Sequence, residues 1–292
     1  MANLKEIRNR ISSVSSTMQI TSAMKMVSAA KLKKAQDAIT AMRPYSDKLT
    51  ELLQNLSASM EGDSGSRFAE ERPVEKVLVI AISSNRGLAG AFNSNIVKEA
   101  KNIADTVYAG KEVHFLTIGK KANDILKKSH TVIFNDSEIF DDLTFENVEA
   151  IAERAMNLFT EGTYDKVELL YNSFKNAATQ IVTREQFLPI VPLKEQFEDV
   201  TPANTADYIF EPSKEEIVKQ LIPKALKTQF FKGIRDSVAS EHGARMTAMH
   251  KATDNASDLI DELISAETTI DAVSSGFIGI SNQPGLQASP DP

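Results

Sequence analysis

The segment 83–90, Ser-Ser-Asn-Arg-Gly-Leu-Ala-Gly, is the part of the sequence whose residue types come nearest to a ligand-binding loop. Gly87 and Gly90 lie between a predicted strand and a predicted helix, where glycine-rich loops cradle phosphate. Their spacing fits neither G-x-G-x-x-G nor the Walker pattern, and no Gly-Lys-Ser/Thr occurs. Arg86 could still bind an anion. We predict a structural turn or a protein contact at Arg86, Gly87 and Gly90, and keep nucleotide binding as the alternative.

Few other residues could support catalysis or bind a metal. Cysteine is absent, which excludes disulfides, thiolate metal sites and cysteine nucleophiles, and only 4 His are present. An acidic cluster lacks EF-hand spacing and is expected to be a solvated loop: Asp136, Glu138, Asp141 and Asp142. No nucleophile with a base and no carboxylate pair in a cleft can be assembled. The sequence therefore predicts no catalytic residue, no metal site and no cofactor.

The elements that carry the loop alternate between strands and helices. Strands are predicted at residues 76–82, 112–118, 131–134, 166–174 and 179–188, and helices at 93–108, 120–128 and 145–160. The continuous apolar run of the first strand is typical of a strand buried on both faces of a parallel sheet. The last strand alternates and is expected to be a hairpin partner. This order predicts a Rossmann-like α/β domain with a largely parallel sheet.

Both ends of the chain are predicted to be long coiled-coil helices. From Leu4 to Met60, apolar residues recur at 3-4 spacing, interrupted by polar Thr21, Lys25, Ser28 and Ser46. Pro44 is expected to kink or break this helix. The second seam is Phe231, Ile234, Val238, His242, Arg245, Met249, Ala252, Ala256, Leu259, Leu263, Ala266, Ile270 and Val273.

The lengths of these helices predict that they pair. As helices, residues 4–60 span about 85 Å and residues 224–274 about 75 Å, whereas the middle domain is about 40 Å across. We therefore expect an antiparallel coiled coil projecting from the domain. Pairing Leu4 with Ala266 would put Lys25 level with Arg245. Two buried cations are unfavourable, so the pair must loosen there or meet an anionic partner.

The charge is unevenly distributed. The net charge is −7 for the whole chain, +5 for residues 1–60, −9 for 61–213 and −3 for 214–292. The overall balance excludes a typical nucleic-acid binder. Between Ile7 and Gln36 the sequence has six basic residues and no acid, which predicts a helix surface that meets carboxylates. No apolar run is long enough to span a bilayer, and residues 1–6 lack the apolar region of a secretory signal.

These patterns divide the chain into five segments. We expect a coiled-coil helix at 1–60, a linker at 61–75, the α/β domain at 76–212, a second coiled-coil helix at 213–275 and a disordered tail at 276–292. Gly276 and Gly279 are expected to end the second helix near Ser275, because glycine costs about 1 kcal/mol in a helix interior.

Three motifs resemble one known family, the gamma subunit of the F-type ATP synthase. They are LKEIRNRI at 4–11 with TSAMKMVSAAK at 21–31, NRGLAGAFN at 85–93, and SEHGARMTAM at 240–249 with ATDNA at 252–256. With the helix–domain–helix order, the resemblance covers about residues 1–263. After Leu263 the chain departs from the family's usual run, which makes the tip of the coiled coil atypical.

The resemblance implies a non-catalytic rotor shaft inside a ring of alternating alpha and beta subunits, coupling proton flow to ATP synthesis at the beta subunits. The α/β domain would form the foot, near the epsilon and delta subunits and the c-subunit ring. The residues expected to face the alpha/beta ring are Met24, Lys25, Val27, Lys31, Arg245 and Met249. The chain is expected to be bacterial and peripheral, on the cytoplasmic face of the inner membrane. The alternatives are a nucleotide-binding Rossmann-like enzyme with a coiled-coil oligomerisation stalk and a membrane-associated structural adaptor.

Overall fold

The computed structural model describes residues 4–58, 67–190 and 214–280. Its elements are α1 (Leu4–Ala58), β1 (Lys76–Ile82), α2 (Phe92–Asn102), the π-helical turn η1 (Ile103–Val107), β2 (Glu112–Ile118), α3 (Lys120–Leu126), β3 (Thr131–Asp136), the 3-10 turn η2 (Glu138–Phe140), α4 (Phe145–Thr160), β4 (Lys166–Phe174), β5 (Gln180–Leu188) and α6 (Lys214–Ile280). The chain divides into two compact units. One, here called the helical-pair unit, contains residues 1–27 and 248–292, and the other, the sheet unit, contains residues 28–247.

The sheet has five strands in the order β3-β2-β1-β4-β5. The pairs β1–β2, β2–β3 and β1–β4 are parallel, and β4–β5 is an antiparallel hairpin. The predicted, largely parallel α/β sheet with a hairpin partner is therefore confirmed. β1 is buried along six of its seven residues, as its continuous apolar run predicts.

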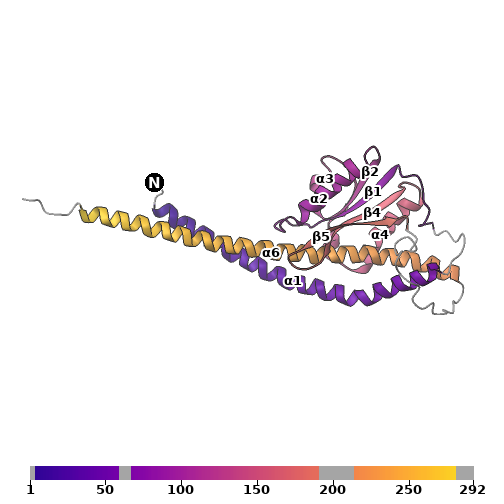
Figure 1. The fold of residues 1–292 in the computed structure, drawn as a ribbon, viewed down its shortest axis with the longest axis horizontal. Helices are drawn as coiled ribbons and strands as arrows, with labels where there is room; N and C mark the ends of the chain where they lie inside the picture. Colours follow the sequence, from indigo (N-terminus) through magenta and orange to yellow (C-terminus); the bar gives the residue numbers. More distant parts are fainter. Residues whose placement is uncertain (1–3, 59–66, 191–213, 281–292) are drawn as a thin grey trace, which may run out of the picture. The chain divides into compact units, whose positions relative to one another are not determined.

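Helices cover both faces of this sheet, as Figure 1 shows for the sheet unit. On one face, α2 and α3 pack through Ile96, Ala100 and Leu126 against the side chains of Val77 and Val79. On the other face, α4 and the first part of α6 enclose a larger cluster. Its members include Leu78, Ile80, Ile151, Phe159, Leu226, Phe230 and Ile234.

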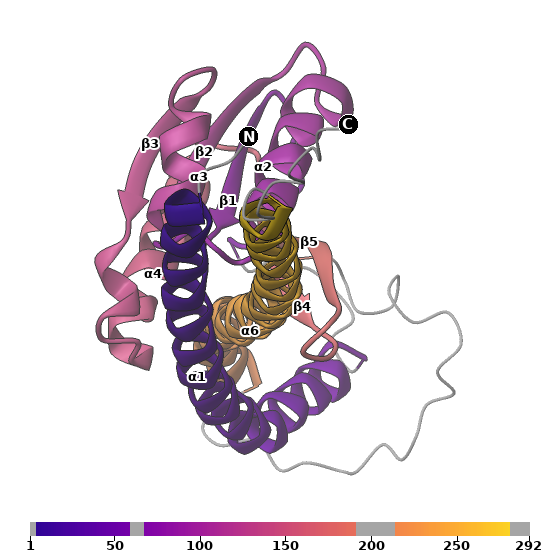
Figure 2. The same cartoon turned by 90° about the vertical axis from the view of Figure 1, so that its left-hand side faces the viewer.

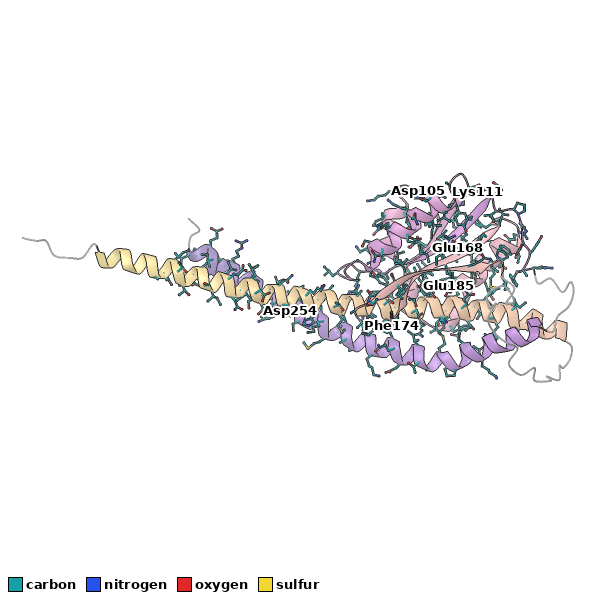
Figure 3. The ribbon with its side chains drawn as sticks, viewed as in Figure 1. Asp105, Lys111, Glu168, Phe174, Glu185 and Asp254 are labelled. Atoms are coloured by element: carbon teal, nitrogen blue, oxygen red, sulfur yellow. The ribbon has the colours of Figure 1, made fainter. Side chains whose placement is uncertain are left out.

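The part of α6 inside the sheet unit has two buried faces. One contributes Leu226, Phe230 and Ile234 to the core beneath the sheet. The other packs against α1, where Ala239 contacts a cluster formed by Leu32, Ala35 and Ile39. Phe174, at the end of β4, packs against the same cluster (Figure 3). The first half of α6 is therefore a core helix of the α/β domain and also one of the two helices that pack together as α1 and α6.

The predicted seam of α1 is confirmed by burial. Its positions are all buried or half-buried where side chains are described: Leu4, Ile7, Ile11, Val14, Met18, Thr21, Lys25, Ser28, Leu32, Ala35, Ile39, Met42, Ser46 and Leu49. In α6 the predicted seam holds as far as Ala256. Beyond it the inward positions are Ile260, Leu263, Glu267 and Ile270, whereas Leu259 and Ala266 are exposed. Two successive four-residue steps, from Ala252 to Ala256 and from Ala256 to Ile260, thus turn the inward face around the helix relative to a strict heptad.

The register of the helical-pair unit differs from the prediction by about one turn. The hydroxyl groups of Thr21 and Thr253 lie 2.9 Å apart, and Arg8 forms an ion pair with Glu267 at 2.6 Å. Figures 1 and 2 show these parts of α1 and α6 side by side. Lys25 is consequently level with Met249, and the predicted pairing of Leu4 with Ala266 is wrong.

Neither of two predicted helix breaks occurs in the structure, whereas a kink at Pro44, the other outcome predicted there, stays a prediction. α1 runs continuously through Pro44, and α6 continues to Ile280, past the expected end at Ser275. A proline or glycine in a helix interior costs about 1–3 kcal/mol, which a helix already formed on both sides can tolerate. Part of the predicted tail, residues 276–280, is therefore helical. The rest of that tail lies outside the described residues.

Candidate functional site

The loop that follows β1 lies where a doubly wound sheet usually binds its ligand. β1 is flanked by β2 on one side and β4 on the other, so the strand order reverses at its carboxyl end. In open α/β sheets, ligands bind in the crevice at this point. The predicted loop residues Arg86, Gly87 and Gly90 are therefore at the position where a nucleotide site would be expected.

Hydrogen bonds within the loop hold its first half. The backbone N–H of Ser84 donates to Asn93 Oδ1 at 2.9 Å, and Ser84 Oγ donates to the carbonyl oxygen of Arg86 at 2.6 Å. α2 begins at Phe92, one residue before the predicted start, and the Asn93 side chain bonds to Ser84. The helix start and the loop are thus tied together by one side chain.

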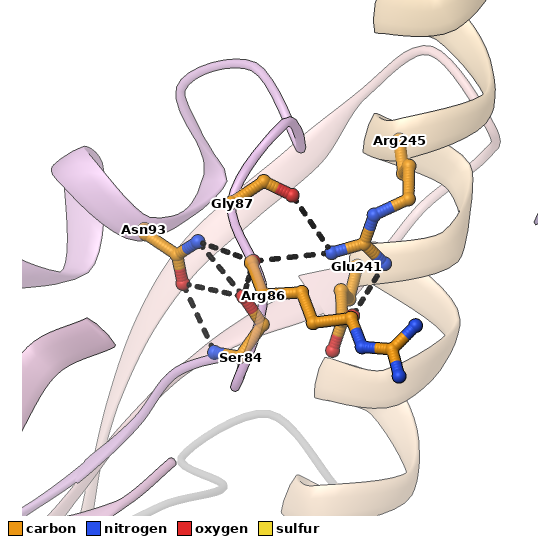
Figure 4. Close-up of polar contacts among 6 residues, drawn as sticks. All are labelled: Ser84, Arg86, Gly87, Asn93, Glu241 and Arg245. Carbon is orange, nitrogen blue, oxygen red and sulfur yellow. Dashed lines mark hydrogen bonds and ion pairs between the residues drawn. The ribbon is translucent and has the colours of Figure 1, made fainter. Parts of the chain in front are cut away.

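Arg245 of α6 is hydrogen-bonded to the backbone of this loop (Figure 4). Its Nη2 donates to the carbonyl oxygens of Arg86 and Gly87, each at 3.2 Å, and its Nη1 contacts Glu241 Oε1 at 2.5 Å. Arg245 is only 8% exposed. A phosphate needs hydrogen-bond donors, but here the loop turns these two carbonyl oxygens toward an arginine of the same chain. This arrangement argues against the nucleotide-binding alternative.

The tip of the loop exposes a leucine in an unusual conformation. Leu88 has φ +61° and is 64% exposed. A non-glycine residue in the left-handed region costs about 1–2 kcal/mol, and such strain concentrates at functional sites. The following residue, Ala89, is buried with Phe92 and Ala244, and Gly90 also has a positive φ of 55°. The sequence analysis identified Gly87 and Gly90 as loop residues, but no sequence pattern indicated the conformation of Leu88.

The second candidate surface is the outer face of α1 in the helical-pair unit. Ile20, Met26 and Val27 are 61%, 65% and 57% exposed, and exposed Ala23 lies on the same side of the helix. Apolar side chains at this spacing form a stripe on one helix face. We call Ile20, Ala23, Met26 and Val27 the outer stripe. The sequence prediction named Val27 but missed Ile20 and Met26.

The other predicted contact residues differ in exposure. Met24 and Lys25 are half-buried, Lys31 is exposed and Met249 is buried. Lys25 has no acidic partner among the described residues. The structure therefore brings Arg245 together with Arg86 and Gly87. It places Lys25 level with Met249 in the helical-pair unit.

Glu168 is a buried carboxylate that could have marked a catalytic site (Figure 3). Arg184 donates to it through Nε at 2.6 Å and Nη2 at 2.7 Å, and the Tyr108 hydroxyl donates to it as well. Burial and the Glu168 carboxylate raise the pKa of Tyr108. Both oxygens of Glu168 are therefore engaged, and the cluster is a structural ion pair between β4 and β5.

His242 lies in the seam of α6 within the sheet unit. Burial, with the nearby positive charges of Arg245 and Lys31, lowers the pKa of His242 to about 4. The folded state thus holds a neutral imidazole, whereas the unfolded chain binds a proton near pH 6.5.

We expect this difference to make the sheet unit acid-sensitive. The stabilisation from neutral His242 is fully present above pH 6.5 and is lost as the pH falls toward 4, because the unfolded state then binds more protons. The loss is about 2–3 kcal/mol. Urea unfolding measured from pH 7 to 4.5 should show a shallower pH dependence for His242→Gln than for the unmodified chain. His250→Gln, at an exposed position, is the control, and an equal change in both variants would contradict the assignment.

Within the described ranges, no cluster of three or more His, Asp or Glu side chains could hold a metal ion. None of the described helices is both long enough and apolar enough to cross a membrane.

Comparison with known proteins identifies the family. The family model described as ATP synthase matches residues 3–267. The ATP synthase gamma chain of Flavobacterium psychrophilum is 68% identical over 263 residues, covering 90% of both chains, and that of Christiangramia forsetii is 66% identical with the same coverage. The rotor of the Euglena gracilis mitochondrial ATP synthase has a TM-score of 0.66 at 19% identity, covering 92% of this chain and 97% of that one, so it supports the fold alone.

A structure of the Tetrahymena thermophila mitochondrial ATP synthase central stalk and c-ring has a TM-score of 0.59 at 26% identity, covering 80% of this chain and 99% of that one. The motifs at 4–31, 85–93 and 240–256 all lie within the part that the family model matches. The chain belongs to the ATP synthase gamma chain family.

Proposed function

We propose that this chain is the central rotor shaft of an F-type ATP synthase, and that it couples proton flow through the membrane sector to ATP synthesis by rotating inside a ring of alpha and beta subunits. The observation that carries this proposal is the helical-pair unit. Two antiparallel helix segments form a compact unit without any part of the sheet, and they expose the outer stripe to solvent. Exposed apolar patches of this kind mark protein contacts.

In this proposal the chain has no active site of its own. Arg245 bonds to the carbonyl oxygens of the loop at which a doubly wound sheet would bind a nucleotide, and the buried carboxylate Glu168 is fully paired. Catalysis would belong to the beta subunits, and the chain would act on them through contacts alone.

The proposed ring contacts lie on two surfaces. The outer stripe, with Met24 next to it on α1, is the first, and the loop 86–90 is the second. Lys25, in the seam between α1 and α6, and exposed Lys31, further along α1, stay proposed ring contacts from the sequence. Met249, which is buried, would act by supporting the first surface. The remainder of the sheet unit is the proposed foot, in contact with the epsilon and delta subunits and the c-subunit ring. The complex would place the chain peripherally on the cytoplasmic face of a bacterial inner membrane.

The asymmetry of the helix pair supplies the mechanism. A pair of unlike helices presents a different face to each of three equivalent partners: the outer stripe of α1 on one side and a largely polar surface of α6 on another. A binding partner shifts the conformational equilibrium of a subunit only when it binds one conformation more tightly than another. Rotation of the helix pair would therefore change the favoured conformation of each catalytic subunit in succession.

We predict that Val27→Glu weakens binding of the chain to a ring assembled from its own alpha and beta subunits. Val27 is exposed in the free chain, so its stability should change by less than about 0.5 kcal/mol. Burying an unpaired carboxylate in an interface costs about 1–3 kcal/mol or more, which weakens binding about tenfold to a hundredfold. Ring binding and the ATP hydrolysis rate of the complex are the measurements.

Ser16→Glu is the matched control. Ser16 is also exposed and lies on the same side of α1, about three turns before Val27, but outside the outer stripe. We expect a much smaller effect from this charge. If both variants bind and support hydrolysis like the unmodified chain, the outer stripe is not a ring contact.

A further inference from the structure

We propose that Arg245 is a positioning residue, which holds the loop 86–90 in the conformation that presents Leu88 to the ring, rather than a residue that contacts the ring directly. This inference rests on the proposed rotor function and deepens it. The sequence-based expectation placed Arg245 itself at the ring.

The contacts of Arg245 are all directed into the chain. Nη2 divides its hydrogen bonds between two consecutive carbonyl oxygens, those of Arg86 and Gly87, at 3.2 Å each (Figure 4). Nη1 is paired with Glu241, one helical turn earlier on α6, and Glu241 is itself mostly buried. The guanidinium group is thus oriented by Glu241 on one side and committed to the loop backbone on the other.

Leu88 follows directly after the two carbonyl groups that Arg245 binds. Its positive φ is unfavourable for a leucine, and its side chain, 64% exposed, gains little packing in return. Such a conformation persists only when the surroundings over-determine it. Ser84 and Asn93 fix the loop before Leu88, Ala89 is buried after it, and Arg245 fixes the peptide groups between them.

The burial of Arg245 separates the two possible roles. At 8% exposure, its guanidinium has little surface to offer a partner, whereas Leu88 at the loop tip has most of its surface free. A partner with an apolar pocket would bind Leu88. Arg245 would affect this binding only by fixing the conformation of the loop.

A double-mutant cycle with Leu88→Ala and Arg245→Lys tests this role. Lysine keeps the positive charge but lacks the planar fork that bonds Glu241 through one nitrogen and the two loop carbonyl groups through the other. If Arg245 acts through Leu88, we expect each single variant to weaken ring binding about fivefold to tenfold. The double variant should then bind the ring as well as the single variant that binds it less tightly. Additive effects would show a direct contact of Arg245 with the ring and would overturn the proposal.

Hydrogen exchange in the free chain is the second measurement and needs no ring. In Arg245→Lys, amides of residues 86–91 should exchange about tenfold faster, while amides of β1 and β4 stay protected. Glu241→Gln, which weakens the hold on Arg245 without touching the loop, should produce the same local change to a smaller extent. Unchanged exchange in the loop of both variants would also overturn the proposal.

The two proposals fail in different ways. If the unmodified chain does not bind the ring at all, the rotor function is wrong, and faster exchange in the loop would still show that Arg245 fixes it. If the unmodified chain binds but Leu88→Ala has no effect while Arg245→Lys does, the rotor function stands and the positioning role is wrong.

Discussion

Replacing Gly119 with alanine is expected to destabilise the sheet unit by about 3 kcal/mol or more. Gly119 directly follows β2 and has φ +97°, and a Cβ atom placed there would lie 2.3 Å from the carbonyl oxygen of Ser83 and 2.8 Å from its carbonyl carbon. The clash is with backbone, which cannot rotate away. Ser83 is also fixed, because its N–H donates to the carbonyl oxygen of Ile118 and its Oγ accepts from the N–H of Ala122.

Gly110→Ala is the control for the cost of the backbone conformation alone. Gly110 also has a positive φ, +81°, but nothing lies within 4 Å of the position of its Cβ atom. We expect a loss of about 1 kcal/mol there. Urea unfolding followed by tyrosine fluorescence suits this test, because Tyr164 and Tyr171 are buried in the core and the chain has no Trp. Equal losses at the two glycines would contradict the steric argument.

Phe230→Ala is expected to cost about 3–5 kcal/mol, the usual range for removing a fully buried phenylalanine. Phe230 has no exposed surface and lies with its ring centre 5.7 Å from that of Phe187 on β5. It joins α6 to the underside of the sheet. If the rotor proposal is right, the variant should also transmit rotation poorly, because α6, which continues into the helical-pair unit, is held less firmly to the sheet.

Phe231→Ala is the matched comparison, since the neighbouring side chain has the same size but is only half-buried, against Phe145 of α4. The loss of stability in Phe231→Ala should be smaller than that in Phe230→Ala, and we expect a loss of about 1–2 kcal/mol. Coupling can be measured as ATP-driven proton pumping relative to ATP hydrolysis in the reconstituted complex. If Phe230→Ala is no more destabilising than Phe231→Ala, α6 is not held to the sheet in the way described.

The strands and the seam of α1 could be predicted from the sequence because local patterns determine them. β1 is an unbroken apolar run, and the seam repeats every three or four residues along one helix. The register between α1 and α6 could not be predicted in this way. It depends on where one helix departs from the heptad, and on pairs such as Thr21 with Thr253 that are 232 residues apart.

The candidate site was only partly predictable for a similar reason. Gly87 and Gly90 identify a loop, and Arg245 stands out as a cation in an apolar seam, but no pattern joins positions that are 158 residues apart. The positive φ of Leu88 is equally invisible, because leucine rarely adopts it and only the surrounding contacts enforce it. The outer stripe was missed because the apolar seam on the opposite face of α1 accounted for most of the helix pattern.

The position of α6 in the core also has a consequence for synthesis on the ribosome. The ribosome synthesises a chain from its N-terminus to its C-terminus. All five strands and α4 are therefore complete before Leu226, Phe230 and Ile234 become available to cover the sheet. Until then, part of the apolar face of a nearly finished sheet has no cover from its own chain. The nascent protein must therefore reach its last quarter before its first folded unit can close, and that interval is when it is most exposed to aggregation and to chaperones.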